Sequence, residues 1–131
     1  MQTFRKDERL RGKKVIQLLF KNGNNLYVAP FRIIWMDHET DSKHPAQVLI
    51  SVSKRNIKTA VDRNIIKRRI REAYRKNKSY FYEFLTSHQK HCIFGILYLE
   101  KAPIPYKDVE EKIIIILERL ISEYKKSYNL H

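Results

Sequence analysis

One stretch of the chain, between residues 62 and 75, combines basic side chains with helical spacing. Counted from Asn64, the positions three, four, seven and eleven residues further on share one face of an α-helix, and they hold Lys67, Arg68, Arg71 and Arg75. Guanidinium and ammonium groups donate charge-assisted hydrogen bonds to phosphate oxygens. Because like charges at this spacing repel one another, a polyanionic partner is the simplest reason for the arrangement. The stretch therefore predicts a surface that binds phosphates.

The helix that must carry these side chains also has an apolar face. Ile66, Ile70 and Ala73 share that face, so we expect a helix over residues 60–77 that packs on a core. A basic connection leads into this helix, and anions are favoured near a helix start. The connection and the first turns of the helix extend the predicted cationic surface, with the following residues: Lys54, Arg55, Lys58, Arg63 and Asn64.

The composition suits a folded chain that binds a polyanion. The 131 residues are enough for one domain spanning 1–131, and 43% of them are hydrophobic, so a core can form. The formal net charge of +13 indicates nucleic acid or an anionic membrane surface as the partner. No apolar stretch approaches the roughly 20 residues that span a bilayer, and the first eight residues lack an apolar signal core. With Cys92 as the single cysteine, these features predict a cytoplasmic protein.

Hydrophobic periodicity and turn residues divide the rest of the chain into elements. We expect helices over residues 10–21 and 108–126, and strands over residues 26–29, 31–36, 47–53 and 91–100. Residues 78–90 either extend the basic helix or cover the core. The order helix, strand, strand, strand, helix, strand, helix predicts an α+β chain folded as an α/β sandwich, a single mixed four-stranded sheet packed by three helices.

Residues with other chemistry are present, but their spacing favours neither catalysis nor metal binding. Acidic and histidine side chains gather in residues 37–44, where a polar loop is favoured over a metal site because no ligand spacing is imposed. Cys92 has apolar neighbours, which favours an inert packed thiol. The aromatic run from Tyr80 to Phe84 can stack on bases or pack on the sheet, and packing is favoured. The sequence holds no paired carboxylates beside a base and no glycine loop for phosphate.

Three blocks of the sequence, taken in their order and spacing, resemble the protein subunit of bacterial ribonuclease P. They are Phe4 to Leu10 followed by Leu19-Phe20-Lys21-Asn22-Gly23; Ser51-Val52-Ser53-Lys54-Arg55; and Arg63-Asn64 with Lys67-Arg68 and residues 70–74. Two positions depart from the family pattern. Ile65 stands where the family usually has arginine, and Leu49 where it often has glycine. Ile65 removes one charge, for which Arg69, one helical turn further on, can compensate.

The resemblance implies an activity, partners and a fold. In this family an RNA subunit cuts the phosphodiester bond between the 5′ leader and the mature part of precursor tRNA, using Mg²⁺ that the RNA holds. The protein is expected to carry no catalytic residues, and no metal ligand is assigned to it, although the sequence does not decide whether it holds a metal. It binds the catalytic RNA and the leader, and neither a membrane nor DNA is expected as a partner. The implied fold is similar to domain 2 of ribosomal protein S5.

The resemblance also implies which residues bind RNA. Those facing the catalytic RNA are Lys54, Arg55, Lys58, Arg63, Asn64, Lys67, Arg68, Arg71 and Arg75. The leader lies in a cleft between the first helix and the sheet, lined by Phe20, Arg32 and Ile34. Periodicity alone instead favours the core for Phe20. For Arg32 an exposed position on an edge strand, and for Ile34 a core position, are each as well supported as a place in the cleft.

Two other functions fit the charge. A ribosomal or ribosome-assembly protein that binds ribosomal RNA through a similar sandwich would show the same basic helix. A DNA-binding helix protein would also be basic, but the sequence has neither a turn and helix before the basic helix nor a dimer seam. The order of the three blocks favours the ribonuclease P protein over both.

Overall fold

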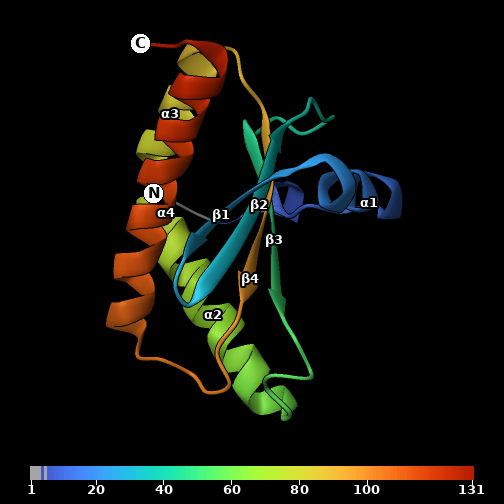
Figure 1. Ribbon diagram of the computed structural model, residues 1–131, viewed down its shortest axis with the longest axis vertical. Coiled ribbons are helices and arrows are strands. Elements are labelled where there is room, and N and C mark those ends of the chain that lie inside the picture. The colour runs from blue at the N-terminus through green and yellow to red at the C-terminus, as the bar shows by residue number, and fades with distance from the viewer. Residues whose placement is uncertain (1–3, 5) are drawn as a thin grey trace.

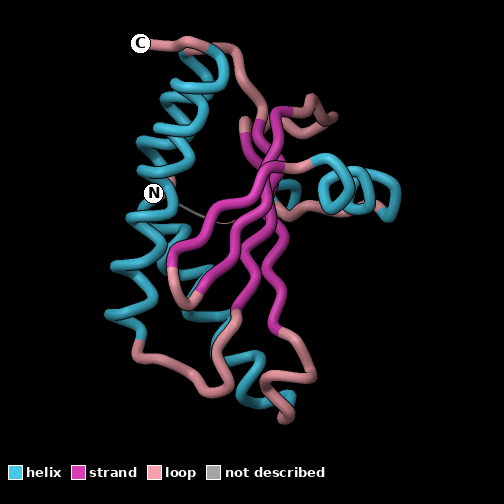
Figure 2. The backbone as a smooth tube through the Cα atoms, viewed as in Figure 1, coloured by secondary structure: helices cyan, strands magenta, loops and turns pink. Residues whose placement is uncertain are grey.

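The computed structural model describes residue 4 and residues 6–131; Arg5, part of the first sequence block, lies outside the described residues (Figure 1). The elements, in chain order, are the short 3-10 helix η1 (Lys6–Glu8), α1 (Lys13–Asn22), β1 (Asn24–Val28), β2 (Phe31–Asp37), β3 (Ala46–Val52), α2 (Ala60–Asn77), α3 (Ser79–Ser87), β4 (Cys92–Tyr98) and α4 (Tyr106–Tyr128). Figure 2 shows the strands as one twisted sheet between helices.

The sheet is mixed, as the sequence predicts, with the strand order β1-β2-β4-β3. β1 pairs with β2, and β2 with β4, in antiparallel fashion, whereas β3 runs parallel to β4. A parallel neighbour requires a crossover connection, and here α2 and α3 provide it. β1 and β3 are the two edge strands.

One face of the sheet is covered by α2 and α4, with α3 beside α4. This main core contains Trp35 and Phe94 from the sheet, Ile66 and Ile70 from α2, and the predicted apolar stripe of α4. Residues 113–116, four consecutive isoleucines, lie inside α4. Isoleucine favours strands locally, but the long amphipathic pattern and the core contacts decide in favour of the helix.

The opposite face of the sheet is only partly covered, by α1, which projects away from the other helices (Figure 1). Leu19 and Leu10 pack there against Ile34 and Ile93 in a second, smaller core. The expected start of this helix at residue 10 is wrong, because α1 begins at Lys13. The amide of Leu10 instead donates to the carbonyl of Val48 on the edge of β3 (3.0 Å). Gly12 then turns the chain with φ of 101°, a conformation that glycine adopts without strain.

The segment that the sequence left open, residues 78–90, forms a helix of its own. The described residues therefore contain four α-helices and not the three expected. Phe81 and Phe84 of α3 are buried, whereas Tyr80 is 67% exposed. Packing thus accounts for most of this aromatic run, as predicted.

Candidate nucleic-acid interface

The basic side chains of α2 project from the face opposite its core contacts. Thr59 caps the helix, because its hydroxyl accepts a hydrogen bond from the backbone N–H of Asp62 at 3.2 Å. Ile66, Ile70, Ala73 and Tyr74 are buried, which fixes the rotation of the helix about its axis. The side chains predicted to bind RNA therefore point outward: Asn64 and Arg68 are exposed, and Lys67, Arg71 and Arg75 are half-buried. We call these five residues the cationic face of α2.

Arg63, also predicted to bind RNA, holds the preceding loop in place. Its Nη1 atom donates to the carbonyls of Ile57 (2.7 Å) and Lys58 (3.1 Å). Those bonds draw the loop that follows β3 back onto the start of α2. The three other predicted cations of the loop, Lys54, Arg55 and Lys58, are exposed there. Arg63 thus brings the loop cations to the same end of the molecule as the start of α2.

Two other arginines of α2 are oriented by partners. Arg75 forms a forked ion pair with Glu72, with Nη2 at 2.6 Å and Nε at 3.1 Å from its two carboxylate oxygens. The hydrogen bond from Arg75 lowers the pKa of the Glu72 carboxyl. Arg69 donates to the carbonyl of Ile104 (2.6 Å), in the loop before α4. Arg69 and Ile65 line the same hollow, so a cation does lie beside the position where the family arginine is replaced.

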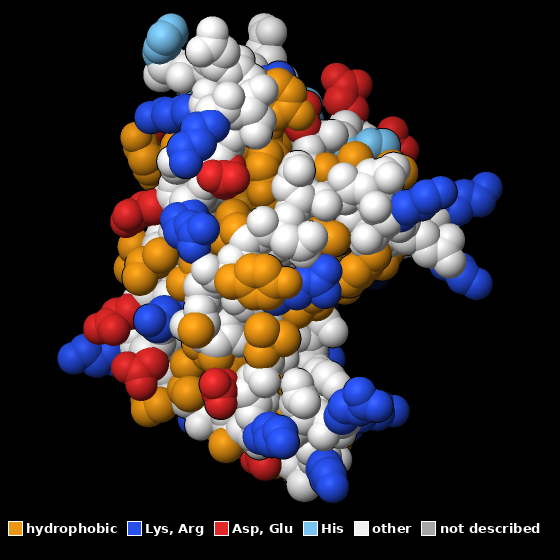
Figure 3. Space-filling view, in the orientation of Figure 1, with side chains coloured by type: hydrophobic (Ala, Val, Ile, Leu, Met, Phe, Trp, Pro, Cys, Tyr) orange, Lys and Arg blue, Asp and Glu red, His pale blue; other side chains and the backbone are white. Residues whose placement is uncertain are grey.

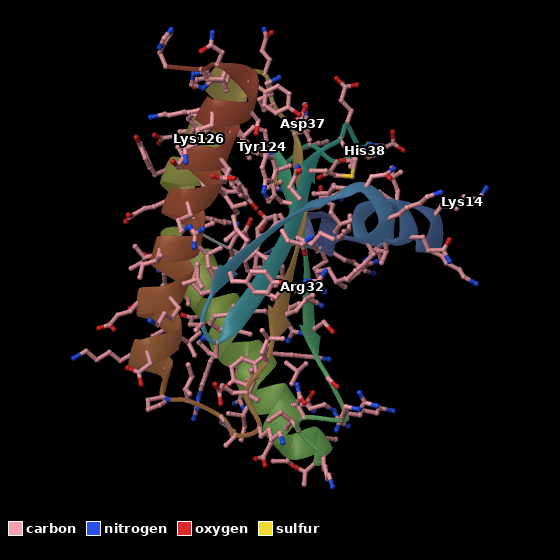
Figure 4. The ribbon with its side chains drawn as sticks, in the orientation of Figure 1. Lys14, Arg32, Asp37, His38, Tyr124 and Lys126 are labelled. Atoms are coloured by element: carbon pink, nitrogen blue, oxygen red, sulfur yellow. The ribbon has the colours of Figure 1, made fainter. Side chains whose placement is uncertain are left out.

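The second predicted surface lies on the sheet face that α1 leaves open. Phe20, at the end of α1, is 42% exposed, so the expectation that it belongs to the core is wrong. Arg32 is half-buried on β2 (Figure 4), where its Nε atom donates to the side-chain oxygen of Asn25 at 2.9 Å. Ile34, predicted to line the cleft, is only 1% exposed and packs with Leu19. Ile34 therefore belongs to the second core and offers no surface to a ligand, so the prediction that it lines a cleft is wrong.

Gly23 sets how closely α1 approaches the sheet. A β-carbon at this position would lie 2.5 Å from the carbonyl oxygen of Leu19 and 2.6 Å from Cγ1 of Ile34. Any larger residue would therefore force the end of α1 away from β2. The glycine of the first sequence block thus has a packing role, which keeps the last turn of α1, where Phe20 lies, close to β2.

The sequence reasoning missed three residues of this open face. In the strand register Tyr27 is opposite Arg32, Arg32 is opposite Leu97, and Leu97 is opposite Ser51, so the four side chains form one row across the sheet. Tyr27 is 60% exposed, and Arg119 of α4 donates to its carbonyl (2.7 Å). Alternation along each strand indicates which of its side chains share a face of the sheet. Which side chains of different strands lie next to one another depends on the strand order, which the sequence does not give.

Basic side chains gather at two places on the face seen in Figure 3, over α1 and over the start of α2, and the surface of α4 mixes both signs. Lys14 extends from α1 away from the sheet (Figure 4). The open row of the sheet lies on the α1 side of β3, and α2 contacts β3 from the other side. The two predicted surfaces are thus separated by the edge strand β3.

Two of the acidic and histidine side chains in residues 37–44, those of Asp37 and His44, have structural partners. Asp37 accepts hydrogen bonds from the backbone N–H of His91 (3.0 Å) and from the hydroxyl of Tyr124 (3.2 Å; Figure 4). His44 lies 3.2 Å from Asp7 and 3.4 Å from Glu8. Within residues 4 and 6–131, no cluster of three or more His, Cys, Asp or Glu side chains is placed to hold a metal ion.

Two further features bear on the predictions from the sequence. Cys92 is buried, and burial raises the pKa of its thiol, as expected for an inert packed cysteine. In the part of the chain that the structure describes, no helix combines the length and the apolar character needed to cross a bilayer.

A small basic α+β sandwich whose packed helix presents a cationic face is typical of proteins that bind nucleic acid. Within that class, the family model for ribonuclease P matches residues 4–120, and the chain belongs to this family. It is thus the protein component of a bacterial ribonucleoprotein that processes the 5′ ends of tRNA, in which the RNA carries out catalysis.

Individual relatives agree with the family assignment. The ribonuclease P protein component of Petrotoga mobilis is 34% identical over 122 residues, covering 91% of this chain and 96% of that protein. That of Porphyromonas gingivalis is 30% identical over 125 residues, covering 93% and 89%. The RNase P protein of Thermotoga maritima superposes with a TM-score of 0.68 at 24% identity (85% and 96% covered), and that of Staphylococcus aureus with 0.68 at 20% (86% and 94%). The two superpositions confirm the fold.

Proposed function

We propose that the chain binds the RNase P RNA through the cationic face of α2 and the basic loop before it, and the 5′ leader of precursor tRNA between α1 and the sheet. Held in this way, the leader is presented to the RNA, which cuts the phosphodiester bond to the mature tRNA. The observation that carries the proposal is the buried apolar stripe of α2, because it holds the basic side chains outward.

The cationic face of α2 suits a structured RNA. Its side chains stand on a packed helix, so little conformational entropy is lost when they meet phosphates. Nine residues are proposed for this contact: Lys54, Arg55, Lys58, Arg63, Asn64, Lys67, Arg68, Arg71 and Arg75. If about six phosphates are neutralised, the logarithm of the affinity falls with the logarithm of salt concentration at a slope of roughly −4 to −5.

The open face of the sheet suits a single strand. Single-stranded RNA is usually bound by a positive groove with aromatic side chains on which bases stack. Phe20 at the end of α1 and Tyr27 on β1 are exposed aromatic side chains, and Tyr27 and Arg32 are neighbours in the row across this face. Contacts of this kind use the backbone and the base planes, so we expect little sequence selectivity in the leader.

In this family the RNA carries out the cleavage, and we propose that Mg²⁺ held by the RNA activates the attacking water. The protein residues bind and orient the substrate. We place the chain in the cytoplasm, because its single cysteine, Cys92, is a free thiol that fits a reducing compartment. The two proposed surfaces share one sheet, which supports a single RNA-binding unit over residues 1–131.

Reconstitution tests this proposal. The RNase P RNA from the same genome is assayed at low Mg²⁺, with and without the chain, on a precursor tRNA. We expect the chain to increase leader cleavage and to raise the affinity for precursor over mature tRNA. If neither quantity changes, the proposal is wrong; preferential binding to ribosomal RNA in the same assays would then favour a ribosome-assembly role.

A further inference from the structure

Three arginines from two separate parts of the chain line one hollow at the edge of β3. Arg9 and Arg11 come from the segment before α1, and Arg71 comes from the cationic face of α2. The hollow has a volume of about 240 Å³, and its other lining residues are Phe4, Leu10, Val48, Leu49 and Ile50. Within residues 4 and 6–131, no carboxylate lines it, so all of its charge is positive.

The structure fixes the position of Arg9. Its backbone bridges Val48 on the edge of β3, and its guanidinium carbon lies 5.3 Å from the ring centre of Phe4. That ring packs edge-on against the buried ring of Tyr74 in α2, at 5.8 Å. A chain of contacts thus places Arg9 beside α2, near Arg71.

The convergence is electrostatically unfavourable in the free protein. Burial, and the nearby charge of Arg9, lower the pKa of Arg71. Among the described residues, none of the three arginines has an acidic partner within 4 Å. A bound anion would relieve this repulsion, and a phosphate accepts the forked hydrogen bonds that guanidinium groups donate.

We propose that Arg9, Arg11 and Arg71 form a binding site for a backbone phosphate of RNA, which we call the β3-edge site. The inference rests on the proposed function and extends it, because it adds the N-terminal segment to the RNA-binding surface. An RNA backbone is the favoured source of the phosphate because the site is continuous with other cations. Arg71 belongs to the cationic face of α2, and on the other side the exposed Lys13 and Lys14 begin α1.

Charge-removing variants test the β3-edge site. Arg11→Gln changes an exposed side chain, and Arg9→Gln changes one that also packs on Phe4. Lys126→Gln, at an exposed position of α4 across the molecule from α1, is the control of equal charge (Figure 4). Affinity is measured for RNase P RNA alone and, with the assembled holoenzyme, for precursor and mature tRNA. We expect Arg9→Gln and Arg11→Gln each to lose about fivefold to tenfold in affinity and to reduce the salt slope by about one.

The free proteins provide the second readout. If the arginines repel one another, the melting temperature of each variant without RNA stays the same or rises while RNA affinity falls. A loss confined to RNase P RNA identifies that RNA as the source of the phosphate, and a loss confined to precursor tRNA identifies the leader. Either result supports the site.

Two results would overturn the proposed β3-edge site. In the first, both RNAs bind the variants as tightly as the unchanged protein, while Lys67→Gln on α2 still weakens binding; the proposed function then stands without this site. In the second, both variants lose affinity only in proportion to a lower melting temperature, which would make the arginines structural.

Discussion

The buried ammonium group of Lys78 lies 2.6 Å from the buried carboxylate of Glu8, a residue 70 positions earlier in the chain. This ion pair fastens η1 to the junction between α2 and α3. His44 approaches the same carboxylate at 3.4 Å, and the ring of Tyr82 lies 5.1 Å from the Lys78 ammonium. Because Arg9 follows Glu8 directly, the ion pair also determines where the N-terminal cations sit relative to α2.

We expect Glu8→Gln to destabilise the protein by about 3 kcal/mol, because it leaves the Lys78 ammonium buried without its counter-charge. Urea unfolding measures the change. Glu123→Gln is the matched control, since Glu123 pairs with Lys126 at 3.7 Å on the exposed face of α4 and is expected to cost under about 1 kcal/mol. Equal losses in the two variants would contradict a buried, structural ion pair.

Gly23→Ala is expected to lower the melting temperature and to weaken leader binding together. The added carbon would overlap the carbonyl of Leu19 and the side chain of Ile34, and relieving such overlap typically costs about 1–3 kcal/mol. The end of α1 must then move, and Phe20 moves with it. Asn22→Ala, at an exposed neighbouring position, should change neither quantity much. A Gly23→Ala protein as stable as the parent would show that α1 tolerates a greater distance from the sheet.

Phe20→Ala should weaken the binding of precursor tRNA to the holoenzyme while mature tRNA binds as before. Stacking on an aromatic ring typically contributes about 1–3 kcal/mol per base, and the ring is 42% exposed, so stability should fall little. Tyr80→Ala removes an exposed aromatic ring from α3 and is the control. Equal losses for precursor and mature tRNA, with a large drop in melting temperature, would make Phe20 a packing residue.

Stability should decline at alkaline pH, in part through Cys92. Burial raises the pKa of this thiol in the folded protein, whereas an unfolded cysteine titrates near 8.5. The unfolded state therefore releases a proton that the native state keeps. The contribution of the neutral thiol to the free energy of unfolding is complete below about pH 8.5. Above that pH the contribution is lost progressively, and the loss reaches about 2 kcal/mol by pH 10.

Comparison with Cys92→Ala isolates this effect from the titration of tyrosines and lysines. Buried Tyr74 and Tyr124 also have raised pKa values caused mainly by burial, so both proteins should lose stability at higher pH. Between pH 8 and 10 the unfolding free energy of the parent should fall more than that of the variant. Parallel curves would indicate that the thiol is accessible to water.

Elements with a strong periodic pattern could be predicted from the sequence. The apolar stripes of α2 and α4 and the alternation of β3 each result from contact with the main core. Such contact is visible in the spacing of apolar residues along the chain. The start of α1 could not be predicted, because Leu10 pairs with Val48 on the edge of a distant strand. The separation of α3 from α2 occurs at Lys78, whose partner is Glu8. Both errors arise from tertiary contacts that override local propensity.

The residues of the candidate site likewise fall into those that the sequence predicts and those that only the structure brings together. The cationic face of α2 could be predicted because its residues lie on one helix. The positions of Arg63 and Arg69 could not, since each donates to a backbone carbonyl outside α2. Tyr27 and Leu97 join Arg32 only through the strand order. Contacts between residues of different helices and strands could thus be identified only from the structure.

If the cationic face of α2 neutralises RNA phosphates, the affinity for RNA must depend on salt concentration through these side chains. The affinity for RNase P RNA is measured over a range of salt concentrations for the parent protein, for Lys67→Gln with Arg68→Gln, and for Lys107→Gln with Lys126→Gln on α4. We expect a parent slope of roughly −4 to −5 that becomes shallower by about two in the α2 variant and stays unchanged in the α4 variant. Equal slopes in all three proteins would contradict it.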